Sequence, residues 1–122
     1  MLFRSIDPMA LLAESPPESA PKVDPWRIRL IRTARGMTQA DLADACGWTT
    51  QNGHQTVCRI ESYAVGVGPD RAEKLAGALA VDAADLCSPV ERWQQNQGLF
   101  FRWRADGSPD LRQWCERLKA SK

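Results

Sequence analysis

The sequence predicts an all-α fold of five helices, followed by a small C-terminal extension built as helix, short strand and helix. Three observations lead to this prediction: apolar residues recur at helical spacing, capping residues precede these runs, and glycines or turn pairs end them. The chain has 122 residues, of which 43% are hydrophobic and 25% charged. This size and composition suit one globular domain with extensions.

The expected division is a flexible Pro-rich arm over residues 1–24, a helical domain over 25–87 and an extension over 88–122. Within the arm, the stretch from Ser15 to Val23 is rich in Pro, Ser and Glu, and we expect it to be a linker. The extension is aromatic and basic, and we expect it to mediate dimerisation.

The first two helices have clear start and stop signals. Asp24 is a typical N-cap with proline next to it, and the following apolar run stops before Gly36. Thr38 caps a second helix in which Asp41, three residues later, can accept from the cap backbone. This helix ends at Gly47, so the two short helices must pack together.

Three more helices complete the predicted domain. Asn52-Gly53 is a strong turn signal, after which residues 53–62 form a third helix with Val57 and Ile60 facing inward. A glycine-containing loop over 64–69 leads to a fourth helix over 70–80. Asp82 caps a short fifth helix that ends near Leu86.

The extension shows mixed periodicity. Ser88-Pro89 starts a helix that is expected to run from Val90 until Gly98, and residues 99–104 alternate with period two, as in a strand. A last helix opens at Ser108-Pro109, with apolar residues at i, i+3, i+4 and i+7.

Charge and cysteine content exclude several classes of function. Residues 26–87 carry seven basic and seven acidic side chains, which counts mildly against nucleic-acid binding, whereas residues 88–122 carry seven basic and four acidic ones. No apolar run reaches the ~20 residues of a membrane span, and the N-terminus does not resemble a secretory signal, so we expect a cytoplasmic protein. The four cysteines form no CxxC pair and His54 is the only histidine. We therefore expect no metal and no cofactor. The sequence also shows no Ser/His/Asp set and no phosphate-cradling glycine loop, so we expect no enzyme activity and no small-molecule substrate.

Several separated motifs match one family in order. These are Arg32-Thr-Ala-Arg-Gly-Met-Thr-Gln-Ala-Asp-Leu-Ala-Asp-Ala-Cys-Gly47, then Thr56-Val-Cys-Arg-Ile-Glu61 and Leu75-Ala-Gly-Ala-Leu-Ala-Val81. Over about half its length the chain resembles the XRE family, the lambda-repressor-like helix-turn-helix DNA-binding domains. The resemblance implies that Gln39 touches backbone phosphate and braces the recognition helix. It also implies that Arg32 and Glu61 form a structural ion pair and that Gln55 and Arg59 contact base edges, with His54 beside them.

The residue types support these roles independently. If Val57 and Ile60 face the core, then His54, Gln55 and Arg59 lie on the exposed side. Arginine can bind guanine and glutamine can bind adenine through paired hydrogen bonds in the major groove. The candidate DNA-binding set is Arg35, Gln39, Gln51, Asn52, His54, Gln55 and Arg59.

The chain departs from the family pattern in two places. Gly47 and Glu61 are separated by about four more residues than usual, which lengthens either the turn or the start of the third helix; Asn52-Gly53 favours the turn. The loop over 63–69, often basic in the family, carries no positive charge. We therefore expect phosphate binding to depend on Gln39, Arg35, Arg71, the backbone amides or the basic tail.

The C-terminal aromatic residues leave two interpretations open. In the first interpretation, they are packing residues that cover the helical core or pair two subunits. In the second, they form a nucleic-acid stacking surface, which the alternation of Arg102 and Arg104 with Phe101 and Trp103 would favour. A strand at this position would need a partner for its edge, which a second copy could supply in a homodimer.

The sequence thus predicts a transcriptional regulator, a repressor of a phage or mobile-element operator that binds double-stranded DNA as a homodimer through its third helix. The alternative is a protein-interaction module of anti-activator or antitoxin-like type with little DNA affinity. RNA binding through the tail ranks last.

Overall fold

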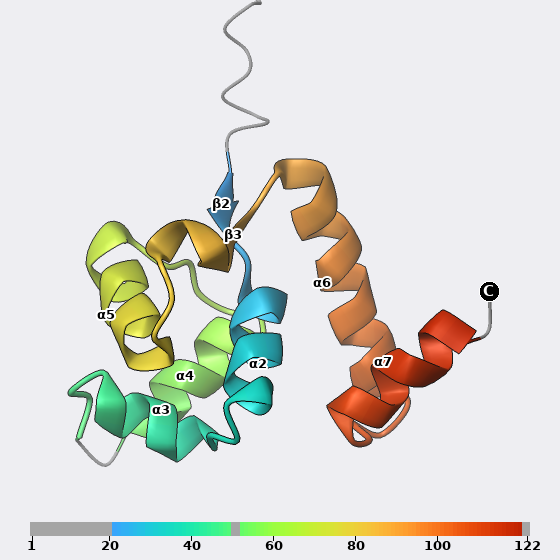
Figure 1. Ribbon diagram of the computed structural model, residues 1–122, viewed down its shortest axis with the longest axis horizontal. Helices are drawn as coiled ribbons and strands as arrows, with labels where there is room; N and C mark the ends of the chain where they lie inside the picture. Colours follow the sequence, from blue (N-terminus) through green and yellow to red (C-terminus); the bar gives the residue numbers. More distant parts are fainter. Residues whose placement is uncertain (1–20, 50–51, 121–122) are drawn as a thin grey trace, which may run out of the picture.

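Helices dominate the part of the chain that the computed structural model describes, residues 21–49 and 52–120 (Figure 1). The predicted all-α fold is confirmed, with one very small sheet added. The elements follow in the order β2 (Lys22–Val23), α2 (Pro25–Ala34), α3 (Gln39–Ala45), α4 (Gly53–Glu61), α5 (Pro69–Leu79), the 3-10 helix η2 (Ala83–Leu86), β3 (Cys87–Ser88), α6 (Val90–Ala105) and α7 (Leu111–Ala120).

The local signals place the first helices as expected. The Asp24 carboxylate accepts a hydrogen bond from the Trp26 amide at 3.1 Å, which caps α2. Thr38 and Asp41 form a reciprocal capping box at the start of α3, with both hydrogen bonds at 3.0 Å. Gly36 and Gly47 follow the two helices with φ values of 73° and 82°, a conformation that glycine adopts without strain. Helix-breaking residues therefore set the short connection between α2 and α3.

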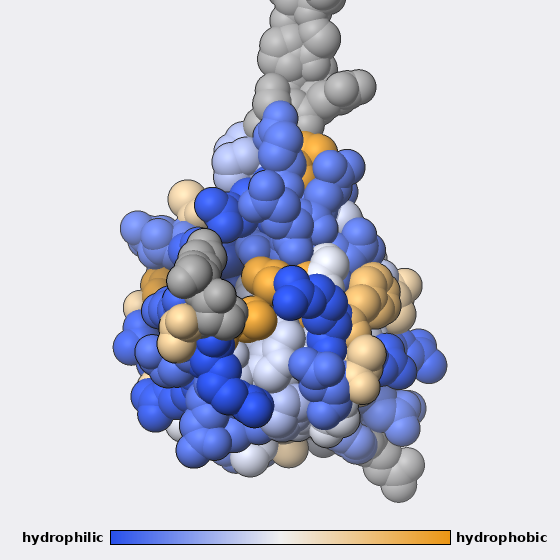
Figure 2. Space-filling view, turned by 90° about the vertical axis from the view of Figure 1, so that its right-hand side faces the viewer, coloured by the Kyte–Doolittle hydropathy of each residue, from blue (hydrophilic) through white to orange (hydrophobic). Residues whose placement is uncertain are grey.

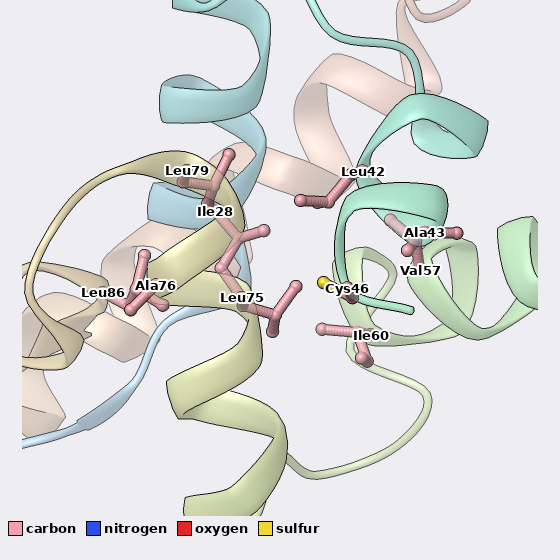
Figure 3. Packing of buried hydrophobic residues seen from close by; sticks show 10 residues of the cluster. All are labelled: Ile28, Leu42, Ala43, Cys46, Val57, Ile60, Leu75, Ala76, Leu79 and Leu86. Carbon is pink, nitrogen blue, oxygen red and sulfur yellow. The ribbon is translucent and has the colours of Figure 1, made fainter. Parts of the chain in front are cut away.

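The main core lies among α2, α3, α4, α5 and η2 (Figure 3). Leu42 from α3 and Val57 and Ile60 from α4 are fully buried in it, so the predicted inward orientation of α4 is confirmed. The whole cluster comprises Ile28, Leu42, Ala43, Cys46, Val57, Ile60, Leu75, Ala76, Leu79 and Leu86. This packing fixes the orientation of α3 and α4 relative to each other.

The strand predicted over residues 99–104 is wrong, because α6 continues as one helix from Val90 to Ala105. This segment is helical because the helix places Phe100 and Trp103, which are three residues apart, on one face. Both side chains are buried there against Trp26. Gly98, expected to end the first helix, lies in the interior of α6 instead. The last helix begins at Leu111, slightly later than the Ser108-Pro109 signal suggests.

The expected linker also ends earlier than predicted. Lys22 and Val23 pair in antiparallel register with Ser88 and Cys87, so they belong to the folded part. Trp93 of α6 donates from its indole nitrogen to the Val23 carbonyl oxygen at 2.9 Å. The start of the helical domain is thereby tied to its end and to the extension.

The extension packs against α2 on the side away from α5 (Figure 1). A second cluster joins Trp26 to Phe100, Trp103, Leu111 and Trp114. The ring of Trp26 makes edge-on contacts with Phe100, Trp103 and Trp114, with ring centroids 6.1 to 6.5 Å apart. These aromatic side chains cover the helical domain within one chain, one of the two interpretations of the sequence.

The outer surface of the extension is mostly hydrophilic. Figure 2 shows hydrophobic residues on this side of the molecule as separate small patches among hydrophilic ones. None of the helices in the described ranges is long and apolar enough to cross a membrane.

Candidate nucleic-acid interface

The connection between α3 and α4 carries the extra residues of this chain. Because α4 begins at Gly53, these residues lengthen the connection and not the helix, as Asn52-Gly53 suggests. Gly53 itself is buried, and a Cβ at this position would clash with the Trp48 carbonyl oxygen. Close packing of the α4 start against the preceding segment therefore requires glycine here.

Helix α4 has one buried and one exposed face. His54, Gln55 and Arg59 are exposed, whereas Val57 and Ile60 are fully buried. Asn52 is the N-cap residue and is exposed, and its side chain makes no capping hydrogen bond. Gln51 lies outside the described residues. Polar side chains able to contact base edges thus project from the first turn of α4, with His54 and Gln55, and from its last turn, with Arg59.

Glu61, at the end of α4, holds the neighbouring helices together. Its side chain is fully buried, and its Oε1 accepts a hydrogen bond from Gln39 Nε2 at 3.1 Å. Arg32 Nε donates to its Oε2 at 2.6 Å and Arg32 Nη2 to its Oε1 at 3.0 Å. Arg32 also donates to the Met37 carbonyl oxygen. These contacts link α2, the start of α3 and the end of α4.

Arg29 is a third partner of Glu61 that sequence reasoning missed. Its Nη2 lies 3.3 Å from Glu61 Oε1, and the side chain is 90% buried between the helical domain and the extension. Its guanidinium lies over the rings of Phe100 and Trp103, 5.2 and 4.6 Å from their centroids. The signal was available, because Arg29 precedes Arg32 by three residues and therefore shares its helix face.

Residues 28–86 match the model of a family described as helix-turn-helix. The matched range contains α3, the connection, α4 and the Glu61 contacts. Residues 28–86 form a helix-turn-helix domain of this family. The resemblance to the XRE, lambda-repressor-like domains is thereby confirmed, and the match supports a DNA-binding regulator of a family that is generally not enzymatic. Neither the curated proteins nor the solved structures contain a match to the chain.

Within the helix-turn-helix domain, Arg35 lies apart from the α4 side chains. Its Nε donates to the Leu79 carbonyl oxygen at 2.9 Å and its Nη2 to that of Ala80 at 3.4 Å. The guanidinium therefore caps the C-terminal end of α5, where a cation complements the helix dipole. The structure brings Gln39, Arg32 and Glu61 together, and it leaves Arg35 outside this group.

Asp24 connects the helix-turn-helix domain to the extension. Its carboxylate is fully buried and accepts from Tyr63 Oη at 3.0 Å and from Asn96 Nδ2 at 2.6 Å, besides the Trp26 amide. Burial, followed by the charge of Asp24, raises the pKa of Tyr63 well above its ordinary value. Sequence reasoning identified Asp24 only as a helix cap, since its other partners are 39 and 72 residues away.

The described residues offer no alternative centre for metal chemistry. Within residues 21–49 and 52–120, no three His, Cys, Asp or Glu side chains gather as a metal-ion site would require. Burial raises the pKa of the thiols of Cys46, Cys87 and Cys115.

Proposed function

We propose that the protein is a sequence-specific transcriptional regulator, a repressor of a phage or mobile-element operator, which inserts α4 into the major groove. The observation that carries this proposal is the exposed row His54, Gln55 and Arg59 on a helix whose opposite face is fully buried. Arg59 has the donors for guanine and Gln55 the donor and acceptor for adenine, each pair worth ~1–3 kcal/mol of discrimination.

Other residues of the proposed interface contact the DNA backbone or flank the groove. Gln39 begins α3 and already braces Glu61, so it is positioned by the same network that holds α4. Gln51 and Asn52 precede α4 and are proposed to contact the same operator. Arg35 is proposed only as a more distant backbone contact, because it donates to carbonyls at the end of α5.

Selection of bound fragments from random duplex DNA tests the proposal. Arg59→Ala should relax base preference at one position, because a base-specific contact is lost. Gln39→Ala should weaken binding to all sequences alike, since phosphate contacts carry no sequence information. If both variants bind with the affinity and preference of the parent, the assignment of α4 to the groove is wrong.

The proposal includes a homodimer, which would match the two-fold symmetry of a palindromic operator. The predicted strand is not available for pairing, because these residues are helical in α6. Phe101 of α6 is 49% exposed, and it is the side chain through which we propose that a second copy packs.

A protein-interaction module remains the second candidate, favoured by the uncharged loop after α4. Residues 63–67 of this loop line a mostly apolar groove together with Lys22, Val23, Pro25 and Trp93. The dependence of binding on salt separates the two candidates: a regulator loses DNA affinity steeply with salt, whereas an interaction module gives no shift even at low salt.

A further inference from the structure

A hollow of about 290 Å³ lies between α4 and the turn that joins α6 to α7. Two arginines and two serines contribute to its wall, and Phe100 and Trp103 contribute aromatic surface. In the part of the chain that the structure describes, neither aspartate nor glutamate lines the hollow. The lining residues are Arg29, Gln39, Cys58, Ser62, Phe100, Trp103, Arg104 and Ser108.

The wall of this hollow carries an excess of positive charge. Arg29 and Arg32 share the single carboxylate of Glu61, so the described residues supply one counter-ion for two guanidinium charges. Arg29 as a whole residue is only 8% exposed. Its Nε is buried and has no hydrogen-bond partner among the described residues. Burial lowers the pKa of Arg29, against the opposing effect of Glu61. A buried cation with incomplete pairing favours an anion nearby.

Arg104 adds a second cation from the extension. It is exposed, and its guanidinium carbon lies 5.9 Å from the centroid of Phe100. Ser108 supplies a hydroxyl group from the α6–α7 turn. The Ser62 hydroxyl at the end of α4 also lines the hollow, and it donates to the Arg59 carbonyl oxygen at 3.2 Å. Guanidinium and hydroxyl donors around an open hollow are suited to the oxygens of a phosphate group.

We propose that this hollow binds a phosphate group, with Arg104 as the contacting cation and Arg29 as the buried source of positive potential. A backbone phosphate of DNA is the occupant that the geometry favours, and this part of the inference rests on the proposed function. Gln39 and Cys58 line the hollow, and Cys58 neighbours Arg59 on the exposed side of α4, so the hollow adjoins the proposed DNA surface. The extension would then replace the basic loop that this chain lacks.

The experiment compares Arg104→Gln with Arg102→Gln in the full chain. Arg102 is also exposed on α6, but it does not line the hollow, so it controls for the loss of one charge. Affinity for a selected and an unrelated duplex is measured against salt. Arg104→Gln should weaken both complexes several-fold and make the log–log slope shallower by about 0.9, as for one lost phosphate contact. Arg102→Gln should leave the slope near that of the parent.

A second arm uses inorganic phosphate without DNA, at constant ionic strength. Phosphate should raise the melting temperature of the parent and of Arg102→Gln, but not that of Arg104→Gln. If the parent binds no DNA yet shows this phosphate effect, the proposed function fails and the site belongs to a free phosphorylated ligand. If phosphate raises the melting temperature of the parent but Arg104→Gln leaves the salt dependence of DNA affinity unchanged, the site also belongs to a free phosphorylated ligand. If Arg104→Gln matches Arg102→Gln in both arms, the phosphate site is refuted.

Discussion

At the scale of single residues, Glu61 has the largest structural consequence in this chain. One fully buried carboxylate is shared by Arg32, Gln39 and Arg29, which come from two different helices. Removing a partner of a buried charge costs more than the pair itself contributes, because the remaining charge stays desolvated. The position of α4 in the proposed interface therefore depends on this group.

Replacing Arg32 by methionine tests that dependence. Arg32→Met keeps the unbranched aliphatic stem of the side chain but removes two hydrogen bonds to Glu61 and one to the Met37 carbonyl oxygen. We expect the free energy of unfolding to fall by about 3 kcal/mol, the lower end of the cost of breaking a buried pair, because Arg29 stays in place. Urea unfolding measures the change.

The matched control is Arg71→Met on α5, where the arginine is exposed. Its free energy of unfolding should stay within about 0.5 kcal/mol of the parent value, as for ordinary surface substitutions. Equal effects for the two substitutions would show that the Glu61 network contributes no special stability.

At the scale of elements, α6 is the helix that the sequence pattern misassigned. Leu99, Phe101 and Trp103 alternate as in a strand, while Phe100 and Trp103 fit one face of a helix. Burial of Phe100 and Trp103 against Trp26 selects the helix, and Gly98 is accommodated within it. Competing local patterns of this kind are resolved only by the partner surface.

Gly98→Ala tests the helical state of this segment. Gly98 is exposed in the interior of α6, and a Cβ would meet no atom within 4 Å. Alanine should raise the free energy of unfolding by roughly 0.5–1 kcal/mol, because glycine is a poor helix former. Thermal or urea unfolding provides the measurement.

The same substitution after α6 should have the opposite sign. Gly107 has a φ of 90°, which alanine adopts only with strain. Gly107→Ala should therefore lower the free energy of unfolding by about 1 kcal/mol or more. Destabilisation by Gly98→Ala would instead contradict a continuous helix over Val90–Ala105.

At the scale of the whole molecule, the free energy of unfolding at alkaline pH depends on buried thiol and phenol groups that stay protonated in the folded state. Burial raises the pKa of Cys46 from 9.0 to about 11, with Lys74 acting in the opposite direction. Burial, then Asp24, also raises the pKa of Tyr63. An unfolded chain loses this thiol proton around the ordinary pKa of 9.0, whereas the folded chain retains it up to about 11. Between these two pKa values the unfolded state binds fewer protons, so stability falls as the pH rises.

The expected outcome is a decrease in the free energy of unfolding between pH 9 and pH 11, where the folded thiol titrates at about 11. Cys46→Ala should have a lower stability at neutral pH, because it opens a small cavity, but a flatter dependence on alkaline pH. Urea titrations at a series of pH values measure both. Cys58→Ala, at an exposed position on α4, controls for the loss of a thiol. Parallel curves for the parent and Cys46→Ala would contradict the assignment.

The sequence by itself determined the helices of residues 25–87 and the side of α4 that faces outward. The signals that determine them act within a few residues. They are the caps at Asp24 and Thr38, the stops at Gly36 and Gly47, and the spacing of Val57 and Ile60. Local interactions can be predicted from the sequence, because the interacting residues lie within one or two helical turns of each other.

Only the tertiary structure decided how the extension folds and what it contributes. The helical state of residues 99–104, the burial of Arg29 and the partners of Asp24 all depend on contacts between segments far apart in the chain. Hydrophobic burial is non-directional, so the aromatic residues of the extension alone do not specify that Trp26 is their partner. The hollow beside α4 depends on that packing, because its lining combines Cys58 and Ser62 of the helical domain with Arg104 and Ser108 of the extension.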